Sequence, residues 1–260
     1  MDKGKAVYSG GIDMVKYYIE DGKVKEFRVE YDEYAVSPRE DRDNICELYI
    51  QWGYRNEHYG DVFDGRTLND IIYELGDKYL EDCGALPASE ILTKLQAKES
   101  EIKIYLVFGY EHSGFTVSME NRYPYNDRFD GGFAGIIFVT RERCEQMGAD
   151  FSQAREIAEA EVKEFDMYLQ GNVYGYITEN ESCWGFYSDK YGDDLFNEIA
   201  AEAGFGDTKF YEEDIAYRLN MRDFTWHCGA SVLVDDAYET WDVIAPTIDE
   251  AMDKAWKHIS

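Results

Sequence analysis

Acidic side chains are concentrated in one quarter of this chain. Residues 150–214 hold 17 acidic and 4 basic residues, almost half of the formal net charge of −28, whereas residues 101–149 hold 7 acidic and 5 basic residues. A net charge this far from zero destabilises a compact fold through self-repulsion. The chain is nevertheless 45% hydrophobic and 16% aromatic, so it can bury a core and is not predicted to be disordered.

This charge has two interpretations. Acidity can serve solubility alone, or it can form a surface that engages a basic site on another protein. The uneven distribution of the acids and the abundance of aromatic residues favour the second interpretation, because solubility requires neither. Phosphate charge dominates the binding of proteins to nucleic acids, so a folded polyanion resembles a nucleic acid to the proteins that bind one.

The sequence predicts a soluble protein of the cytoplasm. It contains no apolar run of 18 or more residues, so no membrane span is expected, and its N-terminus lacks the apolar stretch of a signal peptide. The cysteines are odd in number, widely separated and without a CxxC pair, so we expect them to be reduced. They are Cys46, Cys83, Cys144, Cys183 and Cys228.

Strand patterns occur in both halves of the chain. Residues 12–20 and 23–34 flank Asp21-Gly22, a dipeptide typical of a two-residue hairpin turn. Three apolar segments predict the centre of a sheet, and they comprise residues 102–110, 114–119 and 131–140. A second hairpin is predicted within residues 173–187, whose arms are rich in aromatic side chains.

Helical patterns lie between these strands. Thr67 has the position of an N-cap, because apolar residues follow it at helical spacing, and Pro87 begins a second helix. Residues 152–169 form the longest helical pattern. In the tail, two strands over 224–234 and 237–244 precede a helix that begins after Pro246.

Together these patterns predict an α+β fold, with mixed antiparallel sheets, packed helices and a C-terminal ββα unit. Three parts are expected. Residues 1–149 would form an α+β core domain, residues 150–205 an acidic helix-hairpin-helix module, and residues 206–260 the ββα unit.

No motif with a recognised catalytic mechanism occurs, and we predict no enzyme, catalytic residue, metal or cofactor. The best alternative is Glu101-x-Lys103, with Asp82 upstream, which resembles the spacing of Mg²⁺-dependent nucleases. This spacing is expected by chance in so acidic a chain, and a nuclease of this charge would repel its substrate.

Aromatic side chains in residues 173–187 suggest two roles beside core packing. A stacking platform for bases is disfavoured, because such platforms accompany basic grooves and this segment is acidic. A hydrophobic anchor within an acidic protein-binding face is the other reading, with Trp184 as its candidate.

Three segments of the chain are informative together. The first carries Ser37-Pro38-Arg39 with Asp43-Asn44, and the others are the strand from 130 to 139 and the module from 168 to 187, which ends in SCWGFY. Together they resemble a family of uncharacterised proteins carried by phages, plasmids and transposable elements of Gram-positive bacteria. The resemblance spans roughly residues 30–192 and brings no catalytic residues. It implies a mobile element, whose accessory proteins include acidic DNA mimics that block restriction enzymes or CRISPR effectors.

The leading hypothesis is therefore a non-enzymatic, nucleic-acid-mimicking inhibitor of a host defence complex. Its partner would be a basic nucleic-acid-binding protein, and it would bind neither nucleic acid nor membranes. A homodimer would lengthen its line of acids. The alternatives are a non-catalytic adaptor of the mobile element and, less favoured, the nuclease. The predicted partner-binding residues are Glu156, Glu159, Glu164, Asp166, Glu179, Glu181, Asp189, Asp193, Asp194, Glu198, Glu202 and Trp184.

Overall fold

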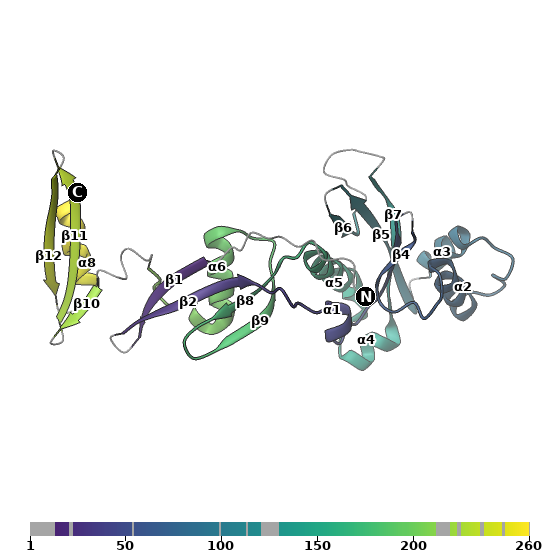
Figure 1. Cartoon of the computed structure of the whole chain (residues 1–260). Helices are drawn as coiled ribbons and strands as arrows, with labels where there is room; N and C mark the ends of the chain where they lie inside the picture. Colours follow the sequence, from purple (N-terminus) through teal and green to yellow (C-terminus); the bar gives the residue numbers. More distant parts are fainter. Residues whose placement is uncertain are drawn as a thin grey trace. The chain divides into compact units, whose positions relative to one another are not determined.

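A computed structural model of the chain consists of two compact units and confirms the α+β class (Figure 1). Of the described residues, unit 1 contains those of Glu33–Val173, and unit 2 contains those of Gly10–Asp32 and Tyr174–Ser260. The structure describes residues 14–20, 23–53, 55–98, 100–112, 114–120, 130–211, 219–222, 225–234, 237–245 and 248–259.

The described part of unit 1 contains a five-stranded antiparallel sheet in the order β4-β3-β7-β5-β6. Its strands are β3 (Glu47–Trp52), β4 (Glu57–Gly60), β5 (Ile102–Glu111), β6 (Phe115–Ser118) and β7 (Gly131–Thr140). The predicted strands over 102–110, 114–119 and 131–140 are all present. Strand β7 lies at the centre, whereas β6 is an edge strand.

Helices cover both faces of this sheet. Side chains alternate along β7, so that Ile136 packs with α2 and α3 while Ile137 packs with α5 on the opposite face. Thr67 and Asp70 form a reciprocal capping box at the start of α2, which confirms the predicted N-cap. The helices of unit 1 are α1 (Pro38–Asp41), α2 (Leu68–Tyr79), α3 (Ala88–Gln96), α4 (Arg141–Met147), a 3₁₀ turn (Phe151–Gln153) and α5 (Ala154–Leu169).

Unit 2 contains a four-stranded sheet in the order β1-β2-β8-β9. Its strands are β1 (Met14–Glu20), β2 (Lys23–Tyr31), β8 (Val173–Ile177) and β9 (Ser182–Tyr187). Helix α6 (Gly192–Ala200) and the π-helical turn Ala201–Phe205 follow β9. Phe27 and Phe196 are fully buried in the core shared by this sheet and α6. Both predicted hairpins are thus neighbouring strand pairs of one sheet.

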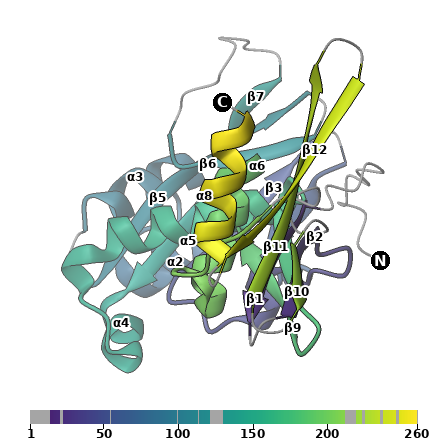
Figure 2. The same ribbon diagram turned by 90° about the vertical axis from the view of Figure 1, so that its left-hand side faces the viewer.

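The C-terminal part of the chain has one more strand than predicted. A three-stranded antiparallel sheet, β10-β11-β12, is followed by helix α8, which packs on β11 and β12 (Figure 2). The bounds are β10 (Leu219–Arg222), β11 (Thr225–Val234), β12 (Ala237–Ala245) and α8 (Ile248–Ile259). The predicted ββα unit is therefore corrected to a βββα arrangement. Strand β10 has only four residues, too few to produce a recognisable alternation.

The boundary between the units falls within the predicted acidic module, residues 150–205. Helix α5 belongs to unit 1, because its apolar side packs on the sheet through Ala158, Val162 and Phe165. The hairpin β8–β9 and helix α6 belong to unit 2. The acids of this segment are consequently divided between the two units.

Candidate functional site

The predicted partner-binding acids of unit 1 lie on α5 and differ in exposure. Glu156 and Glu159 are exposed, and Glu159 forms an ion pair with Arg155 one turn earlier (2.8 Å). Glu164 is half-buried and forms an ion pair with Arg42. Only the first part of α5 therefore presents carboxylates directly to solvent.

Asp166, also on α5, is an acceptor within the fold. Its Oδ1 accepts hydrogen bonds from the Thr116 hydroxyl (2.6 Å) and the Val117 backbone N–H (2.8 Å), and its Oδ2 accepts one from Gln170. Burial raises the pKa of Asp166 despite these hydrogen bonds. Its carboxylate holds edge strand β6 against α5, so Asp166 does not belong to an exposed surface that could bind a partner.

Five of the seven predicted acids of unit 2 form two groups separated by β9. The turn acids, Glu179 and Glu181, lie in the exposed turn between β8 and β9. The helix-start acids, Asp189, Asp193 and Asp194, follow β9 and lead into the first turn of α6, and all three are exposed. A six-residue strand spans about 20 Å. Within unit 2 the carboxylates therefore form two patches rather than one unbroken line.

Two other acids of unit 2 lie farther along α6. Glu198 is half-buried and accepts hydrogen bonds from the Ser188 hydroxyl and from Lys190 Nζ (2.7 Å). Although burial opposes ionisation, these hydrogen bonds hold the pKa of Glu198 below its ordinary value. Glu202 is exposed, in the π-helical turn. Glu198 thus stabilises the loop before α6, whereas Glu202 remains at the surface.

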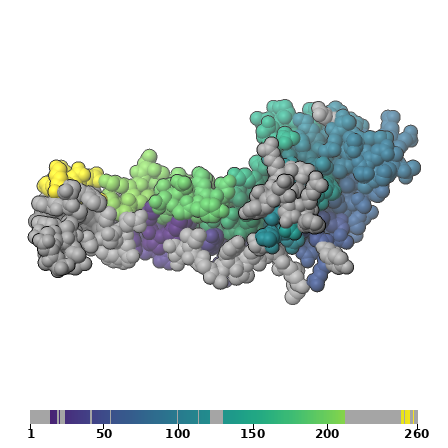
Figure 3. Space-filling model, turned by 90° about the horizontal axis from the view of Figure 1, so that it is seen from above, coloured from purple at the N-terminus to yellow at the C-terminus, as the bar shows by residue number. Residues whose placement is uncertain are grey.

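Exposed aromatic side chains accompany these acids. The Trp184 ring lies on Gly175 of the neighbouring strand, where a Cβ atom would come within 2.1 Å of the ring. The ring nonetheless remains 43% exposed, and Tyr191, directly before α6, is 68% exposed. The segment that carries these residues forms part of the visible surface of unit 2 (green in Figure 3). An aromatic anchor therefore lies on the same strand that separates the two groups of acids.

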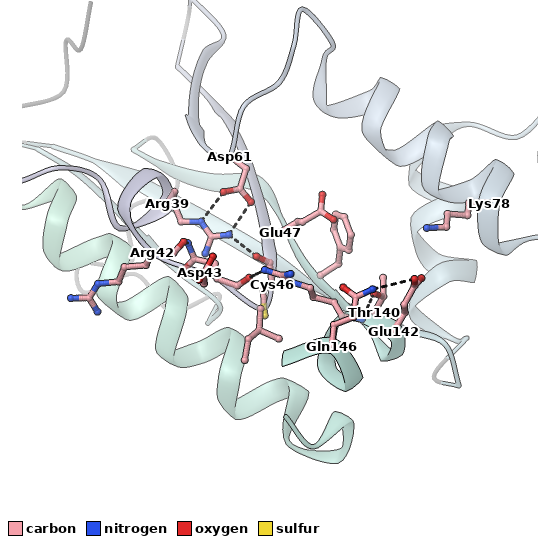
Figure 4. A pocket seen from close by; sticks show the side chains of 14 residues that line it. Arg39, Arg42, Asp43, Cys46, Glu47, Asp61, Lys78, Thr140, Glu142 and Gln146 are labelled. Carbon is pink, nitrogen blue, oxygen red and sulfur yellow. Dashed lines mark hydrogen bonds and ion pairs between the residues drawn. The ribbon is translucent and has the colours of Figure 1, made fainter. Parts of the chain in front are cut away.

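The motif Ser37-Pro38-Arg39 forms a buried ion network in unit 1 (Figure 4). The Arg39 side chain is 2% exposed, and its guanidinium donates two hydrogen bonds to Asp61 (2.9 and 2.8 Å) and one to Glu161 (2.6 Å). A fourth hydrogen bond reaches the Cys46 carbonyl (2.6 Å). Such bidentate, charge-assisted hydrogen bonds are among the stronger ones in proteins.

The same carboxylates also hold the backbone of the neighbouring loop and strand. Glu161 accepts the backbone N–H groups of Ile45 (2.9 Å) and Cys46 (3.2 Å), and Asp61 accepts that of Leu48 (2.8 Å). One arginine thus links α1, β3, the end of β4 and α5. Sequence reasoning missed this network, because its partners lie 22 and 122 residues away from Arg39.

A pocket of about 500 Å³ opens beside this network (Figure 4). Arg39 and Asp61 line it on one side, and Lys78 of α2 points toward it from another. Its lining holds as many basic as acidic residues, although the chain as a whole has twice as many acids. The lining residues are Arg39, Arg42, Asp43, Asn44, Ile45, Cys46, Glu47, Asp61, Lys78, Phe138, Thr140, Glu142, Arg143 and Gln146.

The nuclease alternative rests on Asp82, Glu101 and Lys103, whose surroundings the structure shows. Lys103 donates a hydrogen bond to the Phe151 carbonyl (3.0 Å) and lies over its ring. Asp82 and Glu101 are exposed. Within the described ranges, no group of three or more His, Cys, Asp or Glu side chains has the arrangement of a metal site.

Comparison with known proteins assigns no family: no protein-family model, curated protein or solved structure matches the chain. The resemblance to mobile-element proteins therefore remains a prediction from the quoted segments. None of the described helices has both the length and the apolar character needed to cross a membrane.

Proposed function

We propose that this protein is a non-enzymatic inhibitor of a host defence complex. It would be encoded by a mobile genetic element and would bind a basic nucleic-acid-binding protein, such as a restriction enzyme or a CRISPR effector. The acids of unit 2 would occupy positions that phosphates occupy in the natural complex. The supporting observation is the exposed acid excess around β9 and α6.

The charge balance of this part of unit 2 supports the proposal. Residues 174–211 contain eight acids and two bases, and six of the seven predicted acids in this range are exposed. Four of the exposed acids form no ion pair with another described residue, and they are Glu179, Glu181, Asp194 and Glu202. These carboxylates can pair with a partner without first breaking an internal ion pair.

The mechanism follows from competition. A groove built for a polynucleotide presents Arg and Lys side chains, which bind carboxylates much as they bind phosphate oxygens. Each group of acids would engage one such cluster, and Trp184 would pack between them. Because exposed charge pairs are screened by salt, the affinity must fall as ionic strength rises.

Charge reversal provides a sharp test. We would measure inhibition of DNA cleavage by a panel of restriction enzymes and CRISPR effectors at 50 and 300 mM salt. One variant carries Glu179→Lys and Glu181→Lys, and another carries Asp193→Lys and Asp194→Lys. A matched control, Glu81→Lys with Glu145→Lys, changes the net charge equally at exposed positions of unit 1. We expect inhibition to be lost in the first two variants only, and to weaken with salt.

Two results would contradict the proposal. Equal inhibition by all three variants would show that the predicted surface does not bind the target. An affinity that does not change with salt would show that charge pairing is not the mechanism.

The exposed aromatic side chains favour a second candidate, an adaptor that binds another protein of the mobile element. Trp and Tyr are enriched among the residues that dominate protein interfaces. Affinity capture from infected cells, with Trp184→Ala as the comparison, separates the candidates. A defence nuclease that depends on Trp184 supports the inhibitor, whereas an element-encoded partner supports the adaptor.

A further inference from the structure

The pocket beside the Arg39 network contains cations whose hydrogen-bonding capacity is largely unused. Arg143 of α4 is half-buried and donates one side-chain hydrogen bond, from Nη2 to the Asn44 carbonyl (2.8 Å). A guanidinium has five N–H donors. No carboxylate of a described residue pairs with Arg143, although acids outnumber bases two to one in the chain.

Lys78 brings a second cation to the same pocket. Its ammonium lies over the Tyr79 ring, 5.1 Å from the centroid, and forms no ion pair with a described residue. The Tyr79 side chain, followed by the charges of Glu142 and Glu47, raises the pKa of Lys78. The ammonium is therefore charged at neutral pH and has hydrogen-bond donors to offer.

Three of the four acids of the lining are more fully used than the cations, whereas Asp43 is exposed and accepts no hydrogen bond from a described residue. Asp61 is held by Arg39, Glu47 accepts the Tyr49 hydroxyl (2.9 Å), and Glu142 accepts the Gln146 amide (3.3 Å). The unused hydrogen-bonding groups of the pocket are therefore mainly donors, which the acceptor atoms of a ligand would satisfy.

We propose that this pocket binds the carboxylate or phosphate group of a small polar molecule, with Arg143 and Lys78 as its cationic contacts. A volume of about 500 Å³ lies within the range of small-molecule sites. The guanidinium offers a planar fork that matches two oxygens, and the ammonium offers a point charge. Glu47 and Glu142 each have an oxygen left to accept hydroxyl or amino groups of the same molecule. This site lies within unit 1 and does not depend on the function proposed for unit 2.

Titration of the whole protein with two simple oxyanions tests the proposal. Inorganic phosphate and citrate would be added at constant ionic strength, with chloride as the balancing anion. Binding would be followed by calorimetry and by the NMR signals of arginine Nε–H groups. We expect saturable binding of at least one probe and a selective shift of the Arg143 signal. The probe that binds tells whether the ligand carries a phosphate or a carboxylate.

Three variants give the test its specificity. Arg143→Gln and Lys78→Gln should each weaken binding at least tenfold. Arg155→Gln removes an exposed arginine of α5 that lies outside the pocket lining, and it should bind as the unchanged protein does. Lys78 donates no hydrogen bond to the backbone of a described residue, so Lys78→Gln remains informative if Arg143→Gln does not fold. The proposal is overturned if neither probe saturates up to tens of millimolar, or if Lys78→Gln binds normally.

Discussion

Replacing Arg39 by methionine tests the buried ion network of unit 1. Methionine keeps an unbranched side chain at this position, but the change removes the cation between Asp61 and Glu161. These carboxylates are only 20% and 13% exposed. Removal of one partner from a buried ion pair costs about 3–5 kcal/mol, because it leaves an uncompensated charge. We therefore expect Arg39→Met to lower the free energy of unfolding of unit 1 by about 3–5 kcal/mol.

A rescue variant separates charge from packing. In the Arg39→Met background, Asp61→Asn and Glu161→Gln remove both uncompensated charges. Their amide oxygens can still accept the backbone N–H groups that the carboxylates accept now. If the cost arises from buried charge, this triple variant should regain at least half of the lost stability. A cost that arises from lost packing would not be regained.

Urea unfolding followed by circular dichroism measures the change, since the free energy of unfolding falls linearly with urea concentration. Hydrogen exchange at the amides of Ile45, Cys46 and Leu48 reports on the network locally. Arg155→Met is the control, because its ion pair with Glu159 is exposed and such pairs contribute about 0–1 kcal/mol. The reasoning is refuted if Arg39→Met costs less than about 1 kcal/mol, or if the triple variant is less stable than the single one.

Three further changes test other contacts. Because burial raises the pKa of Asp166 above 3.8, its charge opposes folding at neutral pH. The free energy of unfolding of Asp166→Asn, relative to that of the unchanged protein, should therefore increase as pH rises above about 4. Urea unfolding at several pH values measures this difference, and a difference that does not change with pH would contradict the reasoning. At Gly135 a Cβ would lie 2.0 Å from a carbonyl oxygen of β3, so Gly135→Ala should cost about 1–3 kcal/mol in urea unfolding. Gly84→Ala, whose Cβ meets nothing within 4 Å, is its control. Gly175→Ala should displace the Trp184 ring and shift its signal in fluorine-labelled protein, and an unchanged signal would refute the close contact.

Local signals predicted much of the fold. The N-cap at Thr67 and the helix predicted to begin at Pro87 both depend on neighbouring residues. Thr67 caps α2, and α3 begins at Ala88, directly after Pro87. Hydrophobic periodicity likewise located α5 and three strands of the five-stranded sheet, β5, β6 and β7, because it records which face of each element is buried. Local patterns do not show which other helix or strand covers that buried face.

The candidate functional site shows most clearly what local patterns leave out. Asp166 belongs to the polar positions of α5 by its spacing, yet β6 packs over it and uses its carboxylate as an acceptor. The sequence also contains no sign that Arg39 selects Asp61 and Glu161 from 54 acids, because that choice depends on how distant elements meet. Ion pairs between residues far apart in the sequence could therefore be identified only from the structure.

The net charge alone overstates how much of the acidity can bind a partner. In residues 150–214 some carboxylates serve the fold as acceptors, as Glu161 and Asp166 do. Others are held by cations, and they are Glu159, Glu164, Asp193 and Glu198. Charge pairs with a partner must therefore come mainly from acids that no described cation holds, and in unit 2 these include the turn acids on one side of β9 and Asp194 on the other. It follows that, if the protein acts as proposed, the spacing of these two patches, rather than the total charge, must match the basic clusters of the target. A target whose basic residues form one tight cluster would then engage only one patch, and its binding would respond to reversal of that patch alone.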